Sequence, residues 1–373
     1  MKIGILTLPL HTNYGGILQA YALQTILERM GHDVVVFDTP NKIPIFTWKL
    51  PIKFVKRCFC KFILQKPTKI FYEQWYNKTY PVISQYTQQF IDGYINRLEV
   101  NSFKCLRSNQ FDVFVVGSDQ VWRPIYFSRM FSTKIENAFL DFAKKWDVTR
   151  ISYAASFGTE GWEYREEQTK KCGELLQLFD FVSVREESGV HLCKKMFNVD
   201  AYHVLDPTML LESKDYFALI RRANSPKSLG NMLCYILDST EEKVDIINQI
   251  AKERNLVPFR VNCEDVHMDS PKRIQPPVES WLRGFYDAKF VVTDSFHACV
   301  FSILFKKPFI VIGNKKRGMA RFKSLLAMFG LQNRLIDSFD ISVVCEEIDW
   351  NSVYQILEEK RVLSLSLLSK KLI

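Results

Sequence analysis

The sequence of 373 residues lacks the marks of several protein classes. No uninterrupted apolar run reaches the roughly 18 residues that a membrane-spanning helix needs. Segment 2–8 is too short to be the apolar part of a signal peptide, and polar residues 11–13 follow soon after it. Nine cysteines are present, but no C-x-x-C motif occurs, and the Cys58-x-Cys60 pair has no nearby histidine. We therefore expect a cytosolic protein with reduced thiols and no bound metal.

The G-x-G-x-x-G fingerprint of dinucleotide-binding domains is also absent, so the sequence gives poor support for NAD binding. The formal net charge of +9 is of the sign that nucleic-acid-binding proteins carry. This excess, however, is concentrated in residues 42–69, where eight Lys or Arg side chains occur without any Asp or Glu. Because the positive charge is local, we do not expect nucleic acid as a partner.

Residues 42–69 also contain many large apolar side chains, among them Trp48, Phe54, Phe59 and Phe62. A basic segment with this many aromatic residues is typical of an amphipathic element that lies on an anionic membrane surface. The alternative is a helical excursion whose apolar face packs on its own domain. The sequence leaves both interpretations open.

Length and composition indicate a well-packed protein of two domains, with 47% hydrophobic, 14% aromatic and 24% charged residues. Short β-branched runs alternate with longer amphipathic patterns, which favours an α/β fold with parallel sheets. The expected strands are 2–8, 33–38, 112–116, 151–156, 181–184, 202–205, 232–237, 257–261, 290–293 and 309–312. The expected helices are 17–30, 91–107, 241–254, 279–287, 295–305, 319–329 and a C-terminal one from about residue 350.

The strands form two series that meet in a polar helical stretch at residues 211–227. We place an N-terminal Rossmann-like domain at residues 1–215, with 42–69 as an excursion from it. A C-terminal Rossmann-like domain then covers residues 216–373 and ends in the C-terminal helix.

Polar residues follow the first expected strand. Open α/β sheets bind ligands at the carboxyl ends of their strands, where helix N-termini present free amides. Paired glycines allow a ligand to approach the backbone closely, although such a pair can equally form only a turn. The residues that we expect to bind substrate here are Asn13, Tyr14, Gly15, Gly16 and Gln19.

Two further junctions carry charged side chains. Ser118 and Asp119 follow the strand 112–116. We expect Ser118 to bind substrate, and Asp119 is either a helix N-cap or a hydrogen-bond acceptor or base for a substrate hydroxyl. Arg185 follows the strand 181–184, and its planar guanidinium suits a carboxylate or a phosphate. The alternative role for Arg185 is a surface ion pair with a neighbouring Glu.

The strongest candidate is His297. The strand 290–293 leads through Asp294 and Ser295, which we expect to bind substrate, into a helix whose first turn carries this His. An imidazole there can meet a phosphate beside the free amides, or donate a proton to a bond that forms or breaks. Although a lone His is usually structural, this position favours a catalytic role.

Taken together, these junctions resemble the polysaccharide pyruvyl transferase family. The similar segments occur in order over residues 2–330, and they are NYGGILQAYAL at 13–23 after the first strand, DVFVVGSDQVW at 112–122, SYAASFG at 152–158, VREES at 184–188, LDPT at 205–208, TDSFH at 293–297, KPFIVIG at 307–313 and RF at 321–322. The resemblance implies a fold like that of GT-B glycosyltransferases, with two Rossmann-like domains facing across a cleft. It also implies an enzyme that transfers a pyruvyl group from phosphoenolpyruvate to two sugar hydroxyls, forming a ketal and releasing phosphate.

The resemblance further implies roles for the candidate residues. His297, Arg185 and the helix N-terminus at Ser295 would hold phosphoenolpyruvate and assist proton transfer, without an obligatory metal or cofactor. Loop 13–19 and Asp119 would face the acceptor, a sugar of a bacterial surface polysaccharide (exopolysaccharide) or of its lipid-linked precursor. With a lipid-linked acceptor, residues 42–69 would rest on the inner membrane face as a peripheral contact.

One position departs from the family pattern. Members often carry an Arg-Leu pair just before this His, where the chain has Ser295-Phe296, so one anion-binding guanidinium is missing. The residues that could supply its charge are Lys306, Lys307, Arg317 and Arg321. Two rival functions fit the same architecture: a glycosyltransferase with a nucleotide-sugar donor, and a non-catalytic sugar-binding protein.

Overall fold

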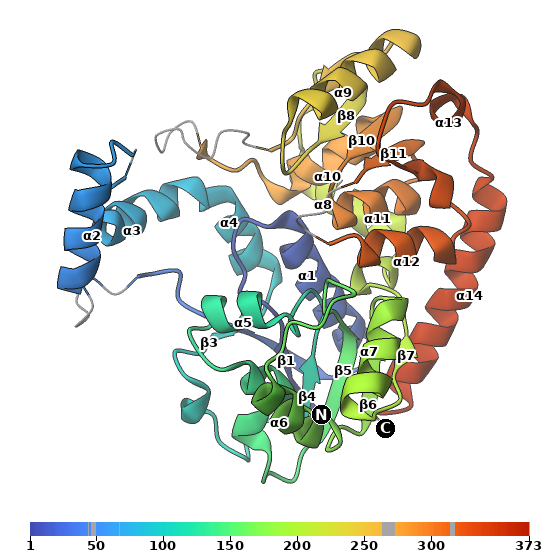
Figure 1. Cartoon of the computed structure of the whole chain (residues 1–373). Coiled ribbons are helices and arrows are strands. Elements are labelled where there is room, and N and C mark those ends of the chain that lie inside the picture. Colours follow the sequence, from blue (N-terminus) through green and yellow to red (C-terminus); the bar gives the residue numbers. More distant parts are fainter. Residues whose placement is uncertain (44, 46–49, 67, 263–272, 314–317, 373) are drawn as a thin grey trace.

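The computed structural model describes residues 1–43, 45, 50–66, 68–262, 273–313 and 318–372. These residues form two α/β halves, and every strand pair within them is parallel (Figure 1). The predicted α/β class with two Rossmann-like halves is therefore confirmed.

The first half contains a sheet of seven strands in the order β3-β2-β1-β4-β5-β6-β7. Their bounds are β1 Lys2–Leu6, β2 Asp33–Asp38, β3 Arg97–Glu99, β4 Val113–Val116, β5 Thr149–Ala155, β6 Phe181–Val184 and β7 Tyr202–His203. The inner strands are covered on both faces, so they are continuous apolar runs such as the Val-Phe-Val-Val of β4. The strand order reverses between β1 and β4, which makes the ends of these two strands the expected ligand-binding edge.

The second half contains a sheet of five strands in the order β12-β11-β10-β8-β9. Their bounds are β8 Met232–Tyr235, β9 Pro258–Phe259, β10 Phe290–Thr293, β11 Phe309–Ile312 and β12 Leu335–Ile336. Here the order reverses between β8 and β10, so the segments that follow these two strands form the corresponding edge.

Three apolar clusters hold the layers together. One lies on the outer face of the first sheet and includes Phe114 and Trp122, and another lies on the outer face of the second sheet. The third, central cluster contains Leu18 of the first half together with Trp281 and Phe301 of the second. Because both halves contribute to this central cluster, they pack on each other there and bring their ligand-binding edges face to face.

The helices agree with the sequence pattern in most places. They are α1 Tyr14–Arg29, α2 Leu50–Phe62, α3 Tyr72–Ile83, α4 Gln85–Tyr94, α5 Pro124–Met130, α6 Glu166–Leu176, α7 Glu187–Phe197, α8 Ser213–Arg222, α9 Glu241–Glu253, α10 Val278–Asp287, α11 Phe296–Leu304, α12 Ala320–Met328, α13 Ile341–Cys345 and α14 Trp350–Ser369. The helix expected at 91–107 is wrong. The chain leaves the helix after Tyr94 because residues 97–99 pair with β2 as the edge strand β3, where Arg97 meets the buried Asp38.

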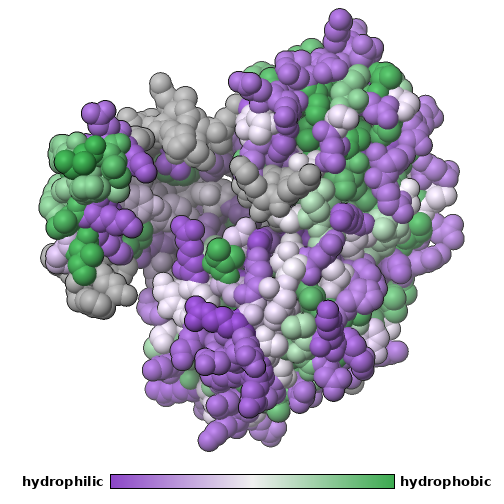
Figure 2. Space-filling model, viewed as in Figure 1, coloured by the Kyte–Doolittle hydropathy of each residue, from purple (hydrophilic) through white to green (hydrophobic). Residues whose placement is uncertain are grey.

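Helices α2 and α3 form an arm that extends away from the two sheets (Figure 1). No residue of α2 is buried, and Ile52, Val55 and Phe62 are each about two-thirds exposed. Figure 2 shows the hydrophobic side chains gathered over this helix. The alternative in which its apolar face packs on its own domain is therefore wrong for α2, whereas Trp48 lies outside the described residues.

The C-terminal helix α14 contacts both halves. Near its start the Tyr354 hydroxyl donates a hydrogen bond to the Leu304 carbonyl of the second half. Further along, the Arg361 Nε–H donates to the Met209 carbonyl, and the Ser364 hydroxyl accepts from the Leu205 N–H. None of the helices in the described part of the chain is long and apolar enough to span a membrane.

Candidate active site between the two sheets

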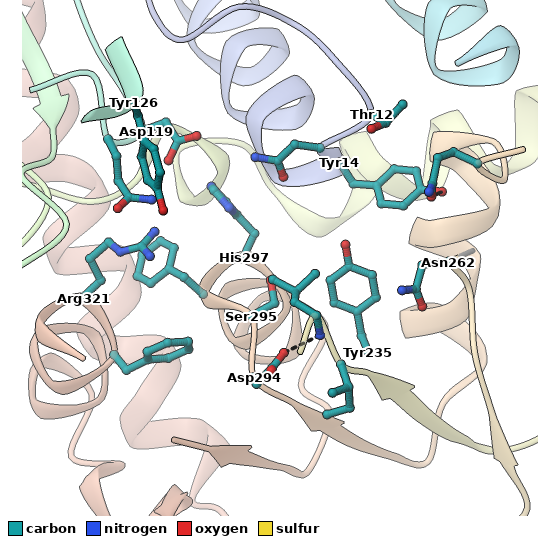
Figure 3. A pocket seen from close by; sticks show the side chains of 17 residues that line it. Thr12, Tyr14, Asp119, Tyr126, Tyr235, Asn262, Asp294, Ser295, His297 and Arg321 are labelled. Carbon is teal, nitrogen blue, oxygen red and sulfur yellow. Dashed lines mark hydrogen bonds between the residues drawn. The ribbon is translucent and has the colours of Figure 1, made fainter. Parts of the chain in front are cut away.

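A cavity of about 360 Å³ lies where the two ligand-binding edges meet. Figure 3 shows Asp119, Tyr126 and Arg321 on one side of His297, and Tyr14 and Tyr235 on the other. The residues that line the cavity are Thr12, Asn13, Tyr14, Asp119, Gln120, Tyr126, Tyr235, Ile236, Leu237, Asn262, Gln275, Asp294, Ser295, Phe296, His297, Arg321 and Phe322. Seven of the sequence-predicted site residues are among them: Asn13, Tyr14, Asp119, Asp294, Ser295, His297 and Arg321.

The N-terminus of α11 forms the wall contributed by the second half. Ser295 is the N-cap residue, and its hydroxyl does not cap the helix, so the amides of the first turn remain available to a ligand at this wall. Asp294 is turned the other way. Its carboxylate accepts from the Leu237 N–H at 2.6 Å and binds the Lys243 ammonium at 2.6 Å, which fixes the loop after β8.

His297 lies at the centre of the site and is only 6% exposed. Its ring rests on the start of α1, where a Cβ added to Gly15 would come within 2.1 Å of the imidazole Nδ1. The absence of a side chain at Gly15 therefore makes room for His297, and not for a ligand as the sequence suggested. The imidazole Nε2 lies 3.5 Å from an Arg185 guanidinium nitrogen and 3.6 Å from Asp206 Oδ2.

Arg185 joins the carboxylates beneath His297. One guanidinium nitrogen donates to Asp206 Oδ2 at 2.7 Å, and the other donates to Asp119 Oδ1 at 3.3 Å. The side chain is about 1% exposed, so the alternative of a surface ion pair is wrong. Arg185 does not line the cavity itself, so its charge acts on the site from underneath.

The two carboxyls of this cluster are held in their ionised form. Burial alone would raise the pKa of Asp206, but the hydrogen bond with His297 and the charge of Arg185 outweigh burial and keep that pKa well below its ordinary range. Burial likewise opposes ionisation of Asp119, and the charges of Arg185, His297 and Arg321 lower its pKa. Asp119 is followed by turns and not by a helix start, so it is not an N-cap.

Arg321 of α12 is the cation that lines the cavity. The Phe296 ring lies between Arg321, at 5.4 Å, and Arg185, at 4.5 Å. Burial and the nearby Arg185 lower the pKa of Arg321 to about 10, so its guanidinium stays protonated at neutral pH. Phe296, the second residue of the pair that departs from the family pattern, is thus in contact with two guanidinium groups.

The other residues considered for this charge are not at the cavity. Lys307 donates to the Tyr286 carbonyl, and the Lys306 ammonium lies over the Tyr354 ring, which places both beyond the far end of α11. Arg317 lies outside the described residues.

On the opposite wall, the first half contributes Asn13 and Tyr14. The Tyr14 hydroxyl donates to the Pro276 carbonyl at 2.8 Å, and its ring stacks on Trp281 at 5.6 Å, so it links the two halves beside the cavity. Gly16 lies in an adjoining cavity of about 240 Å³, which shares Asn13 and Asp119 with the first.

Gln19 and Ser118 are not part of either cavity. Both are fully buried, and the Gln19 amide accepts from the Ser118 N–H at 3.0 Å while donating to Thr7 and to the Gly16 carbonyl. These two residues therefore join the ends of β1 and β4 from behind, and their expected contact with a substrate is wrong.

Some residues of the site were not singled out from the sequence. Asp206 belongs to the LDPT motif and follows β7, so the rule that ligands bind at the carboxyl ends of strands (the strand-end rule) applies to it equally. Tyr235 follows the same rule at the end of β8, whereas Tyr126 comes from α5 and no local signal pointed to it. Among the described residues, no group of three or more His, Cys, Asp or Glu side chains is arranged to hold a metal ion.

Two parallel α/β halves, facing across a polar cavity that lies at both switch points, define a GT-B-like fold. The sequence model described as polysaccharide pyruvyl transferase matches residues 13–316, and the chain belongs to this family, which makes it a transferase-type enzyme. A search of curated proteins found no match.

Solved structures show a similar fold. A putative UDP-N-acetylglucosamine 2-epimerase from Listeria monocytogenes superimposes with a TM-score of 0.51 at 9% sequence identity, covering 98% of this chain and 91% of that one. The UDP-GlcNAc 2-epimerase from Neisseria meningitidis gives a TM-score of 0.48 at 10% identity, covering 100% and 99%. At such low identity, the first likeness shows the fold alone, which is of the GT-B type as expected.

Proposed function

We propose that this enzyme transfers the pyruvyl group of phosphoenolpyruvate to a pair of hydroxyls on a sugar, forming a cyclic ketal. The observation that carries the proposal is the convergence of Arg321, His297 and the amide end of α11 on one wall of the cavity. Asn13 and Asp119 lie across from them and offer polar contacts to a second substrate.

The cavity wall contributed by the second half suits an anionic donor. Phosphoenolpyruvate carries a phosphate and a carboxylate, and these groups bind best to guanidinium forks and to helix N-terminal amides. Arg321 reaches the cavity directly, while Arg185 lies beneath His297 and Phe296. The missing Arg-Leu pair is thus compensated by a guanidinium from α12.

His297 is placed to move the proton that starts the reaction. Proton transfer from its imidazole to C3 of the donor turns the methylene group into a methyl group and leaves C2 electron-poor. The first sugar hydroxyl adds to C2, the bond from C2 to the phosphate oxygen breaks, and the second hydroxyl closes the ring. Two C–O bonds form between C2 and the sugar, and the bond between C2 and the phosphate oxygen breaks. One of the two hydroxyl protons replaces the proton that His297 gave to C3, and the other leaves with the phosphate.

Asp119 is the candidate acceptor for a sugar hydroxyl. Because its carboxyl is ionised, it can accept the hydroxyl hydrogen bond and increase the nucleophilicity of the oxygen. Asp206 does not line the cavity, and we assign it the positioning of His297 and Arg185. Asp206 Oδ2, which lies 3.6 Å from the imidazole Nε2, holds the ring in the orientation that the first step uses.

The test is to incubate the protein with phosphoenolpyruvate and a panel of bacterial surface saccharides, and to follow phosphate release and ketal formation. A parallel reaction replaces phosphoenolpyruvate with nucleotide sugars. We expect acceptor-dependent phosphate release in the first reaction only. Turnover of nucleotide sugars without phosphate release would instead identify the rival glycosyltransferase. Undiminished biological activity of a His297→Ala variant would identify the non-catalytic sugar-binding protein.

We further propose that α2 rests on the inner face of the membrane, where a lipid-linked acceptor would be presented. Ile52, Val55, Phe59 and Phe62 recur at spacings of three and four residues, so they share one exposed face of the helix. The same helix carries Lys53, Lys56 and Lys61, and basic side chains suit anionic lipid head groups. The measurement that tests this placement is the partition of the protein onto anionic vesicles.

A further inference from the structure

The helix α3 carries an aromatic ridge that the proposed reaction does not use. Tyr72, Trp75, Tyr76 and Tyr80 are spaced by three and four residues, which places them on one side of the helix. Tyr76 stacks on Tyr80 with a centroid distance of 5.1 Å, and Tyr72 lies 6.0 Å from Tyr76. The residues of α3 that are buried are Glu73, Thr79 and Ile83, so none of the four rings is fully enclosed in a core.

These rings line a groove of about 340 Å³ that adjoins the active-site cavity. Thr12 lines both spaces, and Arg273, Thr79 and Ile83 complete the groove. At its inner end the Tyr80 hydroxyl lies 3.1 Å from His11 Nδ1, and His11 lines the small cavity that shares Asn13 and Asp119 with the active site. The aromatic ridge therefore leads to the side of the cavity that the acceptor sugar would enter.

We propose that this groove binds the sugars next to the one that receives the pyruvyl group, so that the acceptor is an oligosaccharide or polysaccharide chain. The inference rests on the proposed function and names its acceptor more closely. Pyranose rings present C–H faces that pack on aromatic rings, while their hydroxyls need hydrogen-bonding groups at the rim. Four aromatic rings combined with Thr12, Thr79 and Arg273 provide both kinds of contact.

The groove is chemically distinct from the other cavity of the arm. That cavity, of about 380 Å³, lies between α2 and α3 and is lined mainly by aliphatic residues and phenylalanines, among them Ile45, Phe54, Val55 and Phe71. None of the described residues that line it is a tyrosine. The contrast favours a saccharide in the groove over a lipid chain.

The charge state of the inner end also suits a neutral ligand. Burial lowers the pKa of His11 to about 4, so the imidazole is uncharged at neutral pH. An uncharged imidazole beside the Tyr80 hydroxyl offers a donor and an acceptor to sugar hydroxyls without attracting a second anion.

The experiment measures binding of the full chain to an array of bacterial surface glycans that range from single sugars to hexasaccharides. Three variants accompany the wild type: Trp75→Ala, Tyr72→Ala and the control Tyr86→Ala. Tyr72 and Tyr86 are matched because both are 37% exposed, but only Tyr72 lines the groove. If the replacement at Trp75 impairs folding, the exposed Tyr72 still provides the test.

We expect the wild type to bind oligosaccharides more tightly than the corresponding single sugars. Loss of one stacked ring should weaken oligosaccharide binding by about threefold to tenfold in the groove variants, and leave it unchanged in the control. Equal binding by the wild type and the groove variants would overturn the proposal, as would equal affinity for single sugars and oligosaccharides or no glycan binding at all.

The failure of this proposal can be told apart from failure of the proposed function. The thermal shift of the wild type with phosphoenolpyruvate is measured on the same preparation. A normal shift together with unaltered glycan binding in the groove variants would reject only the groove. Ring-dependent glycan binding with no response to phosphoenolpyruvate would reject only the donor.

Discussion

The active-site cluster and the arm both combine cations with aromatic rings, yet they treat them in opposite ways. In the cluster, Arg185 is buried between two ionised carboxyls, and Phe296 lies between two guanidinium groups. In α2 no residue is buried, and Ile52, Val55 and Phe62 are each about two-thirds exposed. The difference teaches that cations and aromatic rings form a buried network where every charge has a fixed partner, and leave an apolar face open to solvent where the chain itself does not cover it. In our proposal, a membrane surface covers that open face.

The largest effect is expected from removing the central imidazole of the cluster. His297→Asn should lower the rate of phosphate release by about 10²- to 10⁴-fold, because a positioned general acid contributes about that much. The fold should persist, which circular dichroism would confirm. The control is His191→Asn on α7, whose side chain is 77% exposed, and this variant should keep the wild-type rate. Equal rates in the two variants would remove His297 from the chemistry.

The next effect concerns the balance of buried charge. Asp206→Asn leaves Arg185 with one carboxylate partner fewer and should lower the free energy of unfolding by about 3–5 kcal/mol. Chemical denaturation of the variant measures this loss. Asp200→Asn serves as the control because Asp200 pairs with Lys194 at the surface, where a loss of about 0–1 kcal/mol is expected. Similar losses in both variants would mean that Asp206 contributes no more to the free energy of unfolding than a surface carboxylate does.

The membrane attachment that we propose would distinguish the arm from the rest of the surface. Replacing three exposed apolar side chains of α2 with Ser should reduce flotation with anionic vesicles by about 100-fold, since each contributes about 1 kcal/mol or more when buried in the interface. The residues of this variant are Ile52, Val55 and Phe62. The control replaces three exposed apolar residues elsewhere with Ser, and these are Leu229, Val257 and Val362. Equal partition of both variants would exclude a membrane role for α2.

The smallest effect concerns His11, which lies between the two regions. Its folded pKa, lowered by burial to about 4, is below the unfolded value near 6.5, so only the unfolded chain gains this proton between those two pH values. Stability should therefore be fully present above about pH 6.5 and fall by about 1–3 kcal/mol as the pH drops towards 4. Denaturation at several pH values should show a shallower slope in His11→Gln, and an unchanged slope would contradict the assignment.

Much of the fold could be predicted because its strands are short apolar runs between helical patterns. The bounds of β2, β6, β10 and β11 agree with the sequence-based ones. The edge strand β3 could not be predicted, since residues 97–99 become a strand only through pairing with β2. The exposure of α2 could not be predicted either, because an amphipathic pattern shows that a helix has an apolar face but does not show what covers that face.

The site was partly predictable for a similar reason. The strand-end rule found Asn13, Asp119 and His297, which the topology brings to one cavity. It also selected Gln19 and Ser118, because the rule does not tell which side chains of a turn face inward. The contact between Phe296 and Arg321 depends on how α11 and α12 pack, and the spacing of residues along the chain does not predict that packing.

The most direct test of the central claim is a thermal-shift titration of the wild type and Arg321→Gln with phosphoenolpyruvate and with UDP-sugars. A ligand present at 100 times its dissociation constant stabilises the folded state by about 2.7 kcal/mol, which is readily measured. We predict that phosphoenolpyruvate stabilises the wild type, that the Arg321 variant loses most of this response, and that UDP-sugars have no effect. Stabilisation by UDP-sugars without any response to phosphoenolpyruvate would contradict the account.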